Sequence, residues 1–273
     1  MTGNDRHQAL VDKLLEGIEA LTSSERWQGY LDCQSRFHHY SYRNAMLVHL
    51  QRPSASQVAG FRAWRKLGRS VRKGEKAIWI LAPMLSHRDG DDDEAVVRGF
   101  KFVPVFDVTQ TDGRALPSVC DRLVGDDPDD VFPALRAVGE SLGFHVVDHD
   151  FDGSVNGDCS HLERRIRIEL RNSPLQRVKT LAHELAHALL HAEVEDRSVA
   201  ELEAESVAYV VCQALGLETG GYSFGYVTSW AGGGDSAISG IRSSCSRIQS
   251  ASAEVLEAVT SLRSDGLVAA ISA

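Results

Sequence analysis

Apolar residues near the start of the chain recur at intervals of three and four, which is the spacing of one helix face. This stripe predicts an amphipathic helix over residues 8–30. A second helix is expected at 42–50, because Ser41 can cap its start and Pro53 follows its end. The apolar stripe of the first helix consists of Ala9, Leu10, Leu14, Ile18 and Leu21.

Two strand-like runs follow, at residues 77–81 and 100–108. The segment 88–94 between them is strongly acidic and is expected to be a solvated hairpin tip. A calcium site is not expected there, because the spacing of an EF-hand loop is absent. Helices and strands in this order predict an α+β domain over residues 1–117.

Glycine, proline and aspartate become frequent between residues 111 and 130, and this composition predicts a linker at 118–130. Beyond it, the hydrophobic pattern alternates between helical and strand-like spacing. The expected elements are a helix at 131–142, strands at 144–147 and 165–170, a helix from Ser173, and a further helix that ends near Leu215. Such a helix, small sheet and pair of helices form a compact α+β unit over 131–225.

The tail, residues 226–273, has a pattern of its own. Apolar or small residues recur there at alternating steps of three and four, a heptad-like seam that is typical of packed helices. The seam runs through residues 238, 241, 245, 248, 252, 255, 259 and 262. A helix folded back on its own domain explains the pattern, and a helix that binds a partner or a second copy is the alternative.

Composition agrees with two domains. The chain has 273 residues, of which 43% are hydrophobic and 25% charged, as in ordinary globular proteins. No basic-then-apolar leader and no apolar run of about 18–20 residues is present, so no membrane association is expected. The five cysteines lack CxxC spacing, which disfavours both a disulfide framework and a cysteine zinc site. We therefore expect a cytoplasmic protein.

The net charge of −9 is unevenly divided. Residues 1–120 contain 17 Lys and Arg against 14 Asp and Glu, whereas residues 121–273 contain 12 against 24. Opposite bias in the two halves indicates two different tasks. The acidic half is not expected to bind a nucleic-acid backbone.

The acidic half contains the most informative motif, Leu181-Ala-His-Glu-Leu-Ala-His187. On a helix, His183 and His187 lie four residues apart on one face and can bind one metal ion. Glu184 is then placed to act as general base on a water molecule. A helix start is expected here, with Ser173 as N-cap, Pro174 at the first helical position and Gln176 at the third, where it would complete a capping box.

A third ligand must come from another element, because catalytic zinc usually has three protein ligands and one open position. The next helix offers Glu201, Glu203 and Glu205. Ser198 and Glu201 match a capping box, which would occupy Glu201. Glu205 is therefore the expected ligand, with the other two as alternatives. His191 lies about 12 Å along the helix from the first motif histidine, so it is expected to support the site or to end the helix.

The run Arg177-Val-Lys-Thr-Leu-Ala-His-Glu-Leu-Ala-His-Ala-Leu-Leu-His191, followed by Glu203-Ala-Glu-Ser-Val-Ala-Tyr209, resembles the ImmA/IrrE group of bacterial zinc metallopeptidases. The resemblance covers roughly residues 130–225. In that group a glutamate on the helix after HExxH completes the site, and it maps here onto Glu205. The resemblance thus implies Zn²⁺ held by two histidines and Glu205, with Glu184 as the catalytic residue. Candidates for stabilising the oxyanion are Tyr209, Tyr222 and Tyr226.

Residues 52–76 carry eight basic side chains against one acid, Glu75, with aromatic residues interleaved. Phosphate backbones attract such charge, and aromatic rings stack on unpaired bases. A packed core with a solvated charged face explains the same residues equally well.

Four ordered blocks, at 40–53, 58–64, 67–76 and 106–113, are similar to the N-terminal domain of ArdC-type antirestriction proteins. The match spans roughly residues 5–117 and implies binding of single-stranded DNA. In those proteins, too, a zinc-metallopeptidase-like domain follows. The residues assigned to DNA binding are Tyr42, Arg43, Arg62, Trp64, Arg65, Lys66, Arg69, Arg72, Lys73 and Lys76.

Together these patterns predict a single-stranded-DNA-binding antirestriction-type protein of a mobile element that carries a gluzincin-like zinc endopeptidase site. Its partners would be single-stranded DNA and a protein substrate that the sequence does not identify. Two alternatives stay open. One is a non-catalytic DNA-binding protein with a structural zinc site, and the other is a regulatory peptidase that cleaves a repressor. The sequence does not determine the oligomeric state. It also assigns no role to the acidic segment or to the tail.

Overall fold

The computed structural model describes residues 3–87, 95–114, 128–193, 196–219, 222, 224 and 235–271. The fold is a mixture of helices and three small sheets, in agreement with the predicted α+β class. The chain divides into two compact units, one of residues 1–20 with 40–117 and one of residues 21–39 with 118–273. The predicted acidic hairpin tip and most of the predicted linker lie outside the described residues.

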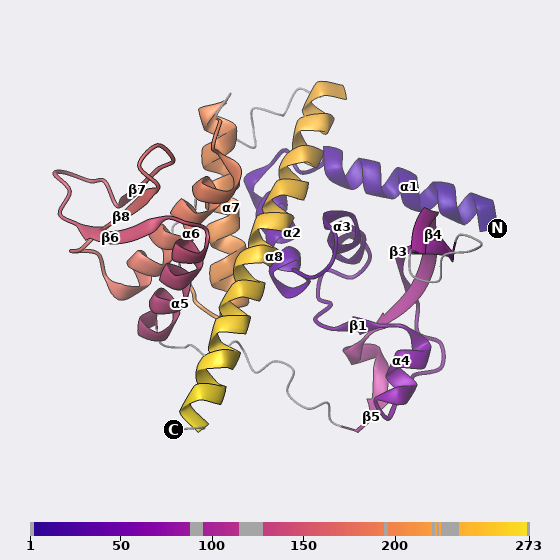
Figure 1. The fold of residues 1–273 in the computed structure, drawn as a ribbon. Helices are drawn as coiled ribbons and strands as arrows, with labels where there is room; N and C mark the ends of the chain where they lie inside the picture. The colour runs from indigo at the N-terminus through magenta and orange to yellow at the C-terminus, as the bar shows by residue number, and fades with distance from the viewer. Residues whose placement is uncertain are drawn as a thin grey trace. The chain divides into compact units, whose positions relative to one another are not determined.

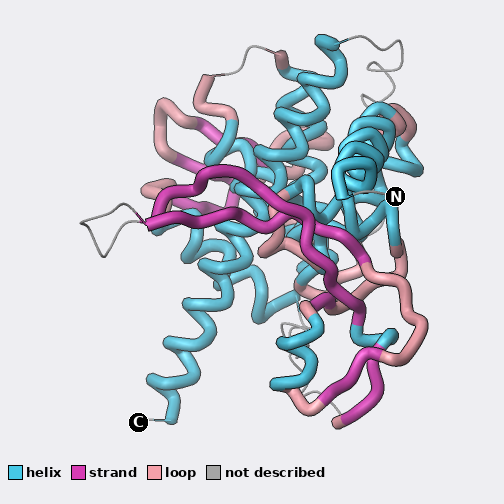
Figure 2. Tube along the Cα trace, turned by 90° about the vertical axis from the view of Figure 1, so that its right-hand side faces the viewer, coloured by secondary structure: helices cyan, strands magenta, loops and turns pink. Residues whose placement is uncertain are grey.

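The first unit contains helices of 6 to 17 residues and two antiparallel sheets, and Figure 2 shows the long strands of its main hairpin. The main sheet has the order β1-β4-β3, with Ile78 opposite Val105. The second sheet pairs β2 with β5. The elements are α1 (Gly3–Glu19), α3 (Tyr42–Gln51), β1 (Val58–Ala59), α4 (Phe61–Lys66), β2 (Arg69–Val71), β3 (Ile78–His87), β4 (Ala95–Asp107), the 3₁₀ turn η1 (Val108–Gln110) and β5 (Thr111–Gly113).

Two side-chain amides of α3 cover the outer edge of β3. Asn44 accepts a hydrogen bond from the Leu81 N–H at 2.8 Å and donates one to the Leu81 carbonyl at 2.9 Å. Gln51 makes the same pair with the backbone of Trp79, at 3.0 and 2.9 Å. Edge strands expose unpaired backbone groups that can recruit other chains. The amides satisfy these groups and fix α3 on the sheet.

The single helix predicted over residues 8–30 is wrong, because the structure has two helices there. The side chain of Ser23 caps the second of them, α2 (Ser24–Arg36). This helix belongs to the second unit, where Trp27 Nε1 donates to Ser206 Oγ at 3.0 Å. The hydrophobic stripe continues across the break, so periodicity alone did not reveal the cap.

The second unit places a three-stranded sheet and a group of helices around the HExxH segment (Figure 1). The strand order is β6-β8-β7, with β6 parallel and β7 antiparallel to the central strand. Strand β7 was not predicted, because its four residues Gly-Asp-Cys-Ser have no alternating pattern of apolar and polar positions. Besides α2, the elements are α5 (Pro128–Ser141), β6 (His145–His149), β7 (Gly157–Ser160), β8 (Arg165–Glu169), α6 (Pro174–Leu190), α7 (Arg197–Ala214) and α8 (Asp235–Ile271).

The tail helix α8 packs on its own unit, against α5, α6 and α7. Its buried seam consists of Ile241, Cys245, Ile248, Ser252, Val255 and Val259. The structure therefore supports the folded-back helix rather than the partner-binding alternative. Within the part of the chain that the structure describes, no helix combines the length and apolar character needed to cross a bilayer.

Candidate metal centre and nucleic-acid interface

Helix α6 presents the two motif histidines at the edge of the core. As predicted, Ser173 caps the helix by accepting a hydrogen bond from the Gln176 N–H at 3.3 Å, and proline occupies the first helical position. The face that packs inward is apolar and fully buried. The two histidines lie beside this face and are partly exposed. The buried residues of this face are Val178, Leu181, Ala182, Leu185 and Ala186.

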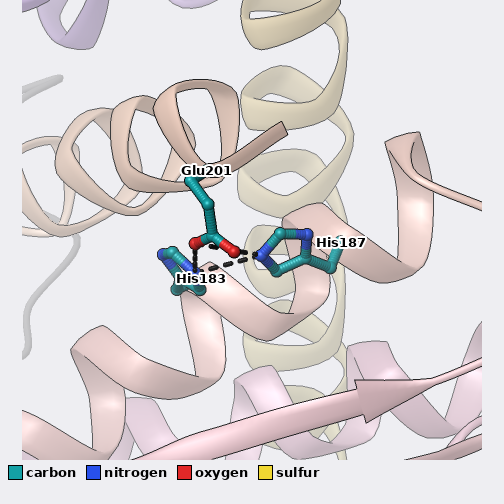
Figure 3. A group of neighbouring side chains, drawn as sticks. All are labelled: His183, His187 and Glu201. Atoms are coloured by element: carbon teal, nitrogen blue, oxygen red, sulfur yellow. Dashed lines mark hydrogen bonds and ion pairs between the residues drawn. The ribbon is translucent and has the colours of Figure 1, made fainter. Parts of the chain in front are cut away.

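Three side chains from two helices converge at this edge. The Nε2 atoms of His183 and His187 lie 3.1 Å apart. Glu201 Oε2, from α7, lies 3.4 Å from the first and 3.8 Å from the second, and Figure 3 shows its carboxylate pointing at both rings. Zinc bonds of about 2.0–2.1 Å in a tetrahedron separate neighbouring donors by about 3.3 Å. The donor atoms thus fit a small tetrahedral metal ion.

The carboxylate of this group is that of Glu201, whereas the sequence analysis had expected Glu205. The capping box inferred at Ser198 does not form, because α7 begins at Arg197 and Asp196 is its N-cap. Asp196 accepts hydrogen bonds from the N–H groups of Ser198 and Val199. Glu201 is therefore free of a capping role and faces α6.

Glu205 lies one turn further along α7 and contacts the other nitrogen of the same ring. Its Oε2 is 3.4 Å from His183 Nδ1, and its Oε1 is 3.1 Å from Lys179 Nζ. A carboxylate on the far nitrogen is the usual support of a metal-binding histidine, because it fixes the tautomer and the ring orientation. In this geometry Glu205 supports His183 and does not belong to the group of atoms that can bind the metal ion.

The pKa values of the two motif histidines indicate that metal binding must displace a proton from the site. Although burial lowers it, hydrogen bonds to Glu201 and Glu205 raise the pKa of His183 to about 9. Burial and the neighbouring His183 lower the pKa of His187 to about 4. Without metal, His183 therefore carries the positive charge and shares its Nε2 proton with the donor group. A metal ion must displace this proton, since only deprotonated imidazole binds metals.

Glu184 is buried beside this group, with only 6% of its surface exposed. Burial raises the pKa of its carboxyl to about 7. Strand β7 approaches it closely at Gly157, where a Cβ would lie 2.6 Å from Thr180 Cγ2 and 3.2 Å from Glu184 Oε1. Glycine is thus required for β7 to lie against α6. A carboxyl group whose pKa is near neutrality is suited to accept and return a proton.

The tyrosines considered for oxyanion binding are engaged elsewhere. The Tyr209 hydroxyl donates to Asp32 and accepts from Gln28 at 3.2 Å, both on α2. The Tyr222 hydroxyl is hydrogen-bonded to Thr219. Tyr226 lies outside the described residues. In this structure neither described tyrosine directs its hydroxyl toward the donor group.

A cleft of about 260 Å³ opens next to the donor group. Its polar walls hold possible donors that the sequence analysis did not consider, namely Asn156, Gln176 and Lys179. The Lys179 ammonium also lies 3.8 Å from the centre of the Tyr222 ring. Gln176 and Lys179 lie on α6 with His183, whereas Asn156 comes from the segment before β7, so the sequence motif does not include it.

In the basic stretch, the structure separates core residues from surface cations. Trp64 is 2% exposed and its indole N–H donates to the Phe106 carbonyl at 2.8 Å, so it is a core residue that no base can stack on. Its assignment to DNA binding is not supported. Arg69 donates to Thr111 Oγ1 at 2.7 Å and to the Thr111 carbonyl at 2.9 Å, and so joins β2 to β5. Arg72 binds Glu75 at 2.8 Å.

Arg72 is nevertheless exposed, and five further assigned cations are exposed on the surface of the first unit: Arg62, Arg65, Lys66, Lys73 and Lys76. Arg43 is exposed too and stacks on the half-buried Tyr42, with its guanidinium carbon 5.7 Å from the ring centre. Phe61 and Phe100 are 49% and 53% exposed. Phe100 was predicted only as the first residue of a strand, and nothing in the sequence marks it as exposed.

Comparisons with known proteins found family matches to two parts of the chain. Residues 4–109 match the N-terminal domain of the anti-restriction factor ArdC. Residues 140–212 match the IrrE N-terminal-like domain, which is a peptidase family. The chain therefore joins an ArdC-type N-terminal domain to an IrrE-like peptidase-type domain, and this confirms the resemblance seen in the sequence.

Two solved structures share the fold. The metal-free antirestriction protein ArdC of plasmid R388 superposes with a TM-score of 0.52 at 22% identity, covering 80% of this chain and 85% of that one. The Mn(II)-bound form of the same protein gives 0.51 at 22% identity, covering 84% and 97%. The uncharacterized protein pXO2-81 of Bacillus anthracis is 25% identical in an alignment of 275 positions, which covers 82% of this chain and 46% of that protein. The chain spans about half the length of this curated relative.

Proposed function

We propose that this chain is a zinc-dependent endopeptidase joined to a single-stranded-DNA-binding domain, and that it acts in antirestriction in the cytoplasm. One observation carries the enzymatic part. The donor atoms of His183, His187 and Glu201 all lie within 4.8 Å of one another, next to the buried carboxyl of Glu184. A structural site would need a fourth protein ligand, whereas three ligands leave room for water and substrate.

The chemistry follows from the places of these side chains. When bound, zinc supplies a Lewis acid that polarises the scissile carbonyl and makes water a stronger acid. Glu184 takes the proton of the attacking water and returns it to the leaving amine. Glu205 keeps the proton of His183 on Nδ1, so that Nε2 stays available. The polar side chains of the cleft are the candidates that receive the developing oxyanion.

The outer edge of β7 is suited to hold an extended peptide. In the described sheet β7 pairs only with β8 and is therefore an edge strand. Peptides commonly add to such an edge as a further strand. Because Gly157 of β7 lies against Glu184, a peptide paired there would pass the general base. The substrate would then be an unfolded or loop segment of a protein.

The DNA-binding part rests on the surface cations and on the similarity to the ArdC N-terminal domain. The exposed rings of Phe61 and Phe100 can stack on bases that are unpaired, while Arg62, Arg65 and Lys66 attract phosphates. Binding to single strands would concentrate the peptidase near proteins that act on the same DNA.

Salt dependence should separate surface cations from structural ones. We expect combined Ala replacement of Arg62, Arg65, Lys66 and Lys73 to weaken binding of the full chain to an oligonucleotide. Each lost phosphate contact lowers the slope of log K against log salt by about 0.7 for single strands. Fluorescence anisotropy at several salt concentrations measures this. The full chain is used because α2 packs in the second unit.

The matched control is a variant with Lys13→Ala and Arg26→Ala, two exposed cations outside the basic stretch, which should keep the wild-type slope. Wild-type protein should also bind single strands more tightly than duplex. Equal affinity for both forms would remove base stacking from the proposal.

A protection assay tests the combined function. Unmodified plasmid DNA is transferred into restricting cells that express wild type, Glu184→Gln or the four-cation variant. Both variants should lose protection if proteolysis near DNA is the activity. Full protection by Glu184→Gln, together with failure of the cation variant, would instead establish a non-catalytic DNA-coating protein.

A further inference from the structure

Beyond the donor group, a line of polar contacts connects a metal-binding histidine to the tail helix. His187 Nδ1 lies 3.0 Å from His191 Nδ1. The other nitrogen of that ring, Nε2, lies 3.2 Å from Glu203 Oε2. From α8, Arg247 Nε donates to Glu203 Oε2 at 2.8 Å, and Arg247 Nη2 and the Ser244 hydroxyl donate to Oε1. We call His191 and Glu203, with these two residues of α8, the relay.

The hydrogen bonds of the relay determine which ring nitrogen carries the proton in His191 and in His187. A carboxylate that receives both arms of a guanidinium and a hydroxyl proton acts as an acceptor. The Nε2 of His191 must therefore donate to Glu203. In the neutral ring the remaining nitrogen, Nδ1, is then an acceptor and takes a hydrogen bond from His187 Nδ1–H. This leaves the lone pair of His187 on Nε2, the nitrogen that faces the donor group.

The relay is costly as a purely structural feature. Glu203 is 1% exposed and His191 9% exposed, so a full charge and an imidazole are taken out of water. Apolar residues of similar volume would often pack as well or better in such a place. Arg247 remains 41% exposed and lines a cavity of about 500 Å³, so the pair is not needed to fill space.

We propose that the relay positions His187 for metal binding, so that metal affinity depends on contacts made by the tail helix α8. This rests on the proposed function only in that His187 is taken as a ligand. Glu205 supports His183 directly, whereas support for His187 comes through two residues and ends on α8. His191, Glu203, Ser244 and Arg247 are positioning residues that touch neither metal nor substrate.

The test measures zinc affinity of the full chain by competition with a chromogenic chelator. Removing partners behind a metal-binding histidine typically weakens binding about 10–100-fold. We expect a loss of this size for His191→Phe and for Arg247→Met, and a smaller loss for Arg247→Lys, which keeps the positive charge and one donor nitrogen in place of two. The matched control is Arg242→Met on the same helix, which should stay within about twofold of wild type.

A second readout is the tautomer of His187 in the metal-free protein, observed through the ¹⁵N shifts of its ring. Wild type should show the proton on Nδ1, and Arg247→Met a mixture of both tautomers. If His191→Phe does not fold, the spectrum of Arg247→Met still tests whether the relay positions His187. Unchanged zinc affinity and an unchanged tautomer in Arg247→Met would overturn the relay.

Failure of the relay is distinguishable from failure of the proposed function. If His187→Ala keeps wild-type zinc affinity, His187 is not a ligand and the proposed metal centre itself is wrong. If His187→Ala loses zinc while His191→Phe and Arg247→Met bind it normally, the centre stands and only the relay falls.

Discussion

Glu201→Ala should leave the purified protein with no more than a trace of zinc, whereas Glu205→Ala should still bind it with reduced affinity. The carboxylate of Glu201 reaches both Nε2 atoms, while that of Glu205 reaches only Nδ1 of His183. Three ligands leave no redundancy, so loss of one is severe, and loss of a supporting partner costs about 10–100-fold in affinity. Metal content by mass spectrometry and a competition titration measure both effects.

His183→Ala and His187→Ala should behave like Glu201→Ala. Glu218→Ala, at an exposed carboxylate just beyond α7, is the control and should bind one zinc per chain. Full zinc content in Glu201→Ala, combined with loss in Glu205→Ala, would restore the ligand set that the sequence had suggested.

The HExxH helix could be predicted from the sequence because the residues that determine it are local. Its N-cap, its proline and its apolar stripe all lie within the segment itself and are found as expected, although the Gln176 side chain donates to Thr180 and does not complete the capping box. The third ligand depended on where the next helix begins. Ser198 and Asp196 can both cap a helix, and a shift of two residues decides whether Glu201 belongs to the cap or faces α6. Sequence spacing does not distinguish these alternatives.

Other features depended on contacts between distant segments. Nothing in the sequence of α2 places it in the second unit, since its partner Ser206 lies far along the chain. Similarly, a tryptophan among basic residues suggests a ring on which bases stack, and only the burial of Trp64 shows that it belongs to the core. The composition of the stretch predicted surface cations, but only the fold separated Arg69, which holds a strand, from Arg62 and Lys66.

Glu184→Gln should lower kcat/KM for peptide hydrolysis by about 10²–10⁴-fold, the usual contribution of a general base. The amide has the same shape as the buried carboxyl but accepts no proton. Zinc content should not change, because Glu184 is not part of the donor group. Stability should not fall either, since the substitution removes an ionisable group whose burial raises its pKa to about 7.

Because the substrate is unidentified, cleavage is read from new protein N-termini in cells that express wild type or Glu184→Gln. A small set of termini should occur with wild type alone. The control is Glu140→Gln, an exposed carboxyl of α5, which should give the wild-type set. Identical N-termini in all three cell lines would contradict a peptidase.

The most direct measurement is an anomalous difference map at the zinc absorption edge, from crystals of the zinc-loaded protein. It should show one strong peak in the second unit, within about 2.0–2.2 Å of His183 Nε2, His187 Nε2 and a Glu201 oxygen. Glu184 should lie beside the peak without binding it. A peak held by Glu205 in place of Glu201, or no peak among these side chains, would contradict the proposed metal centre.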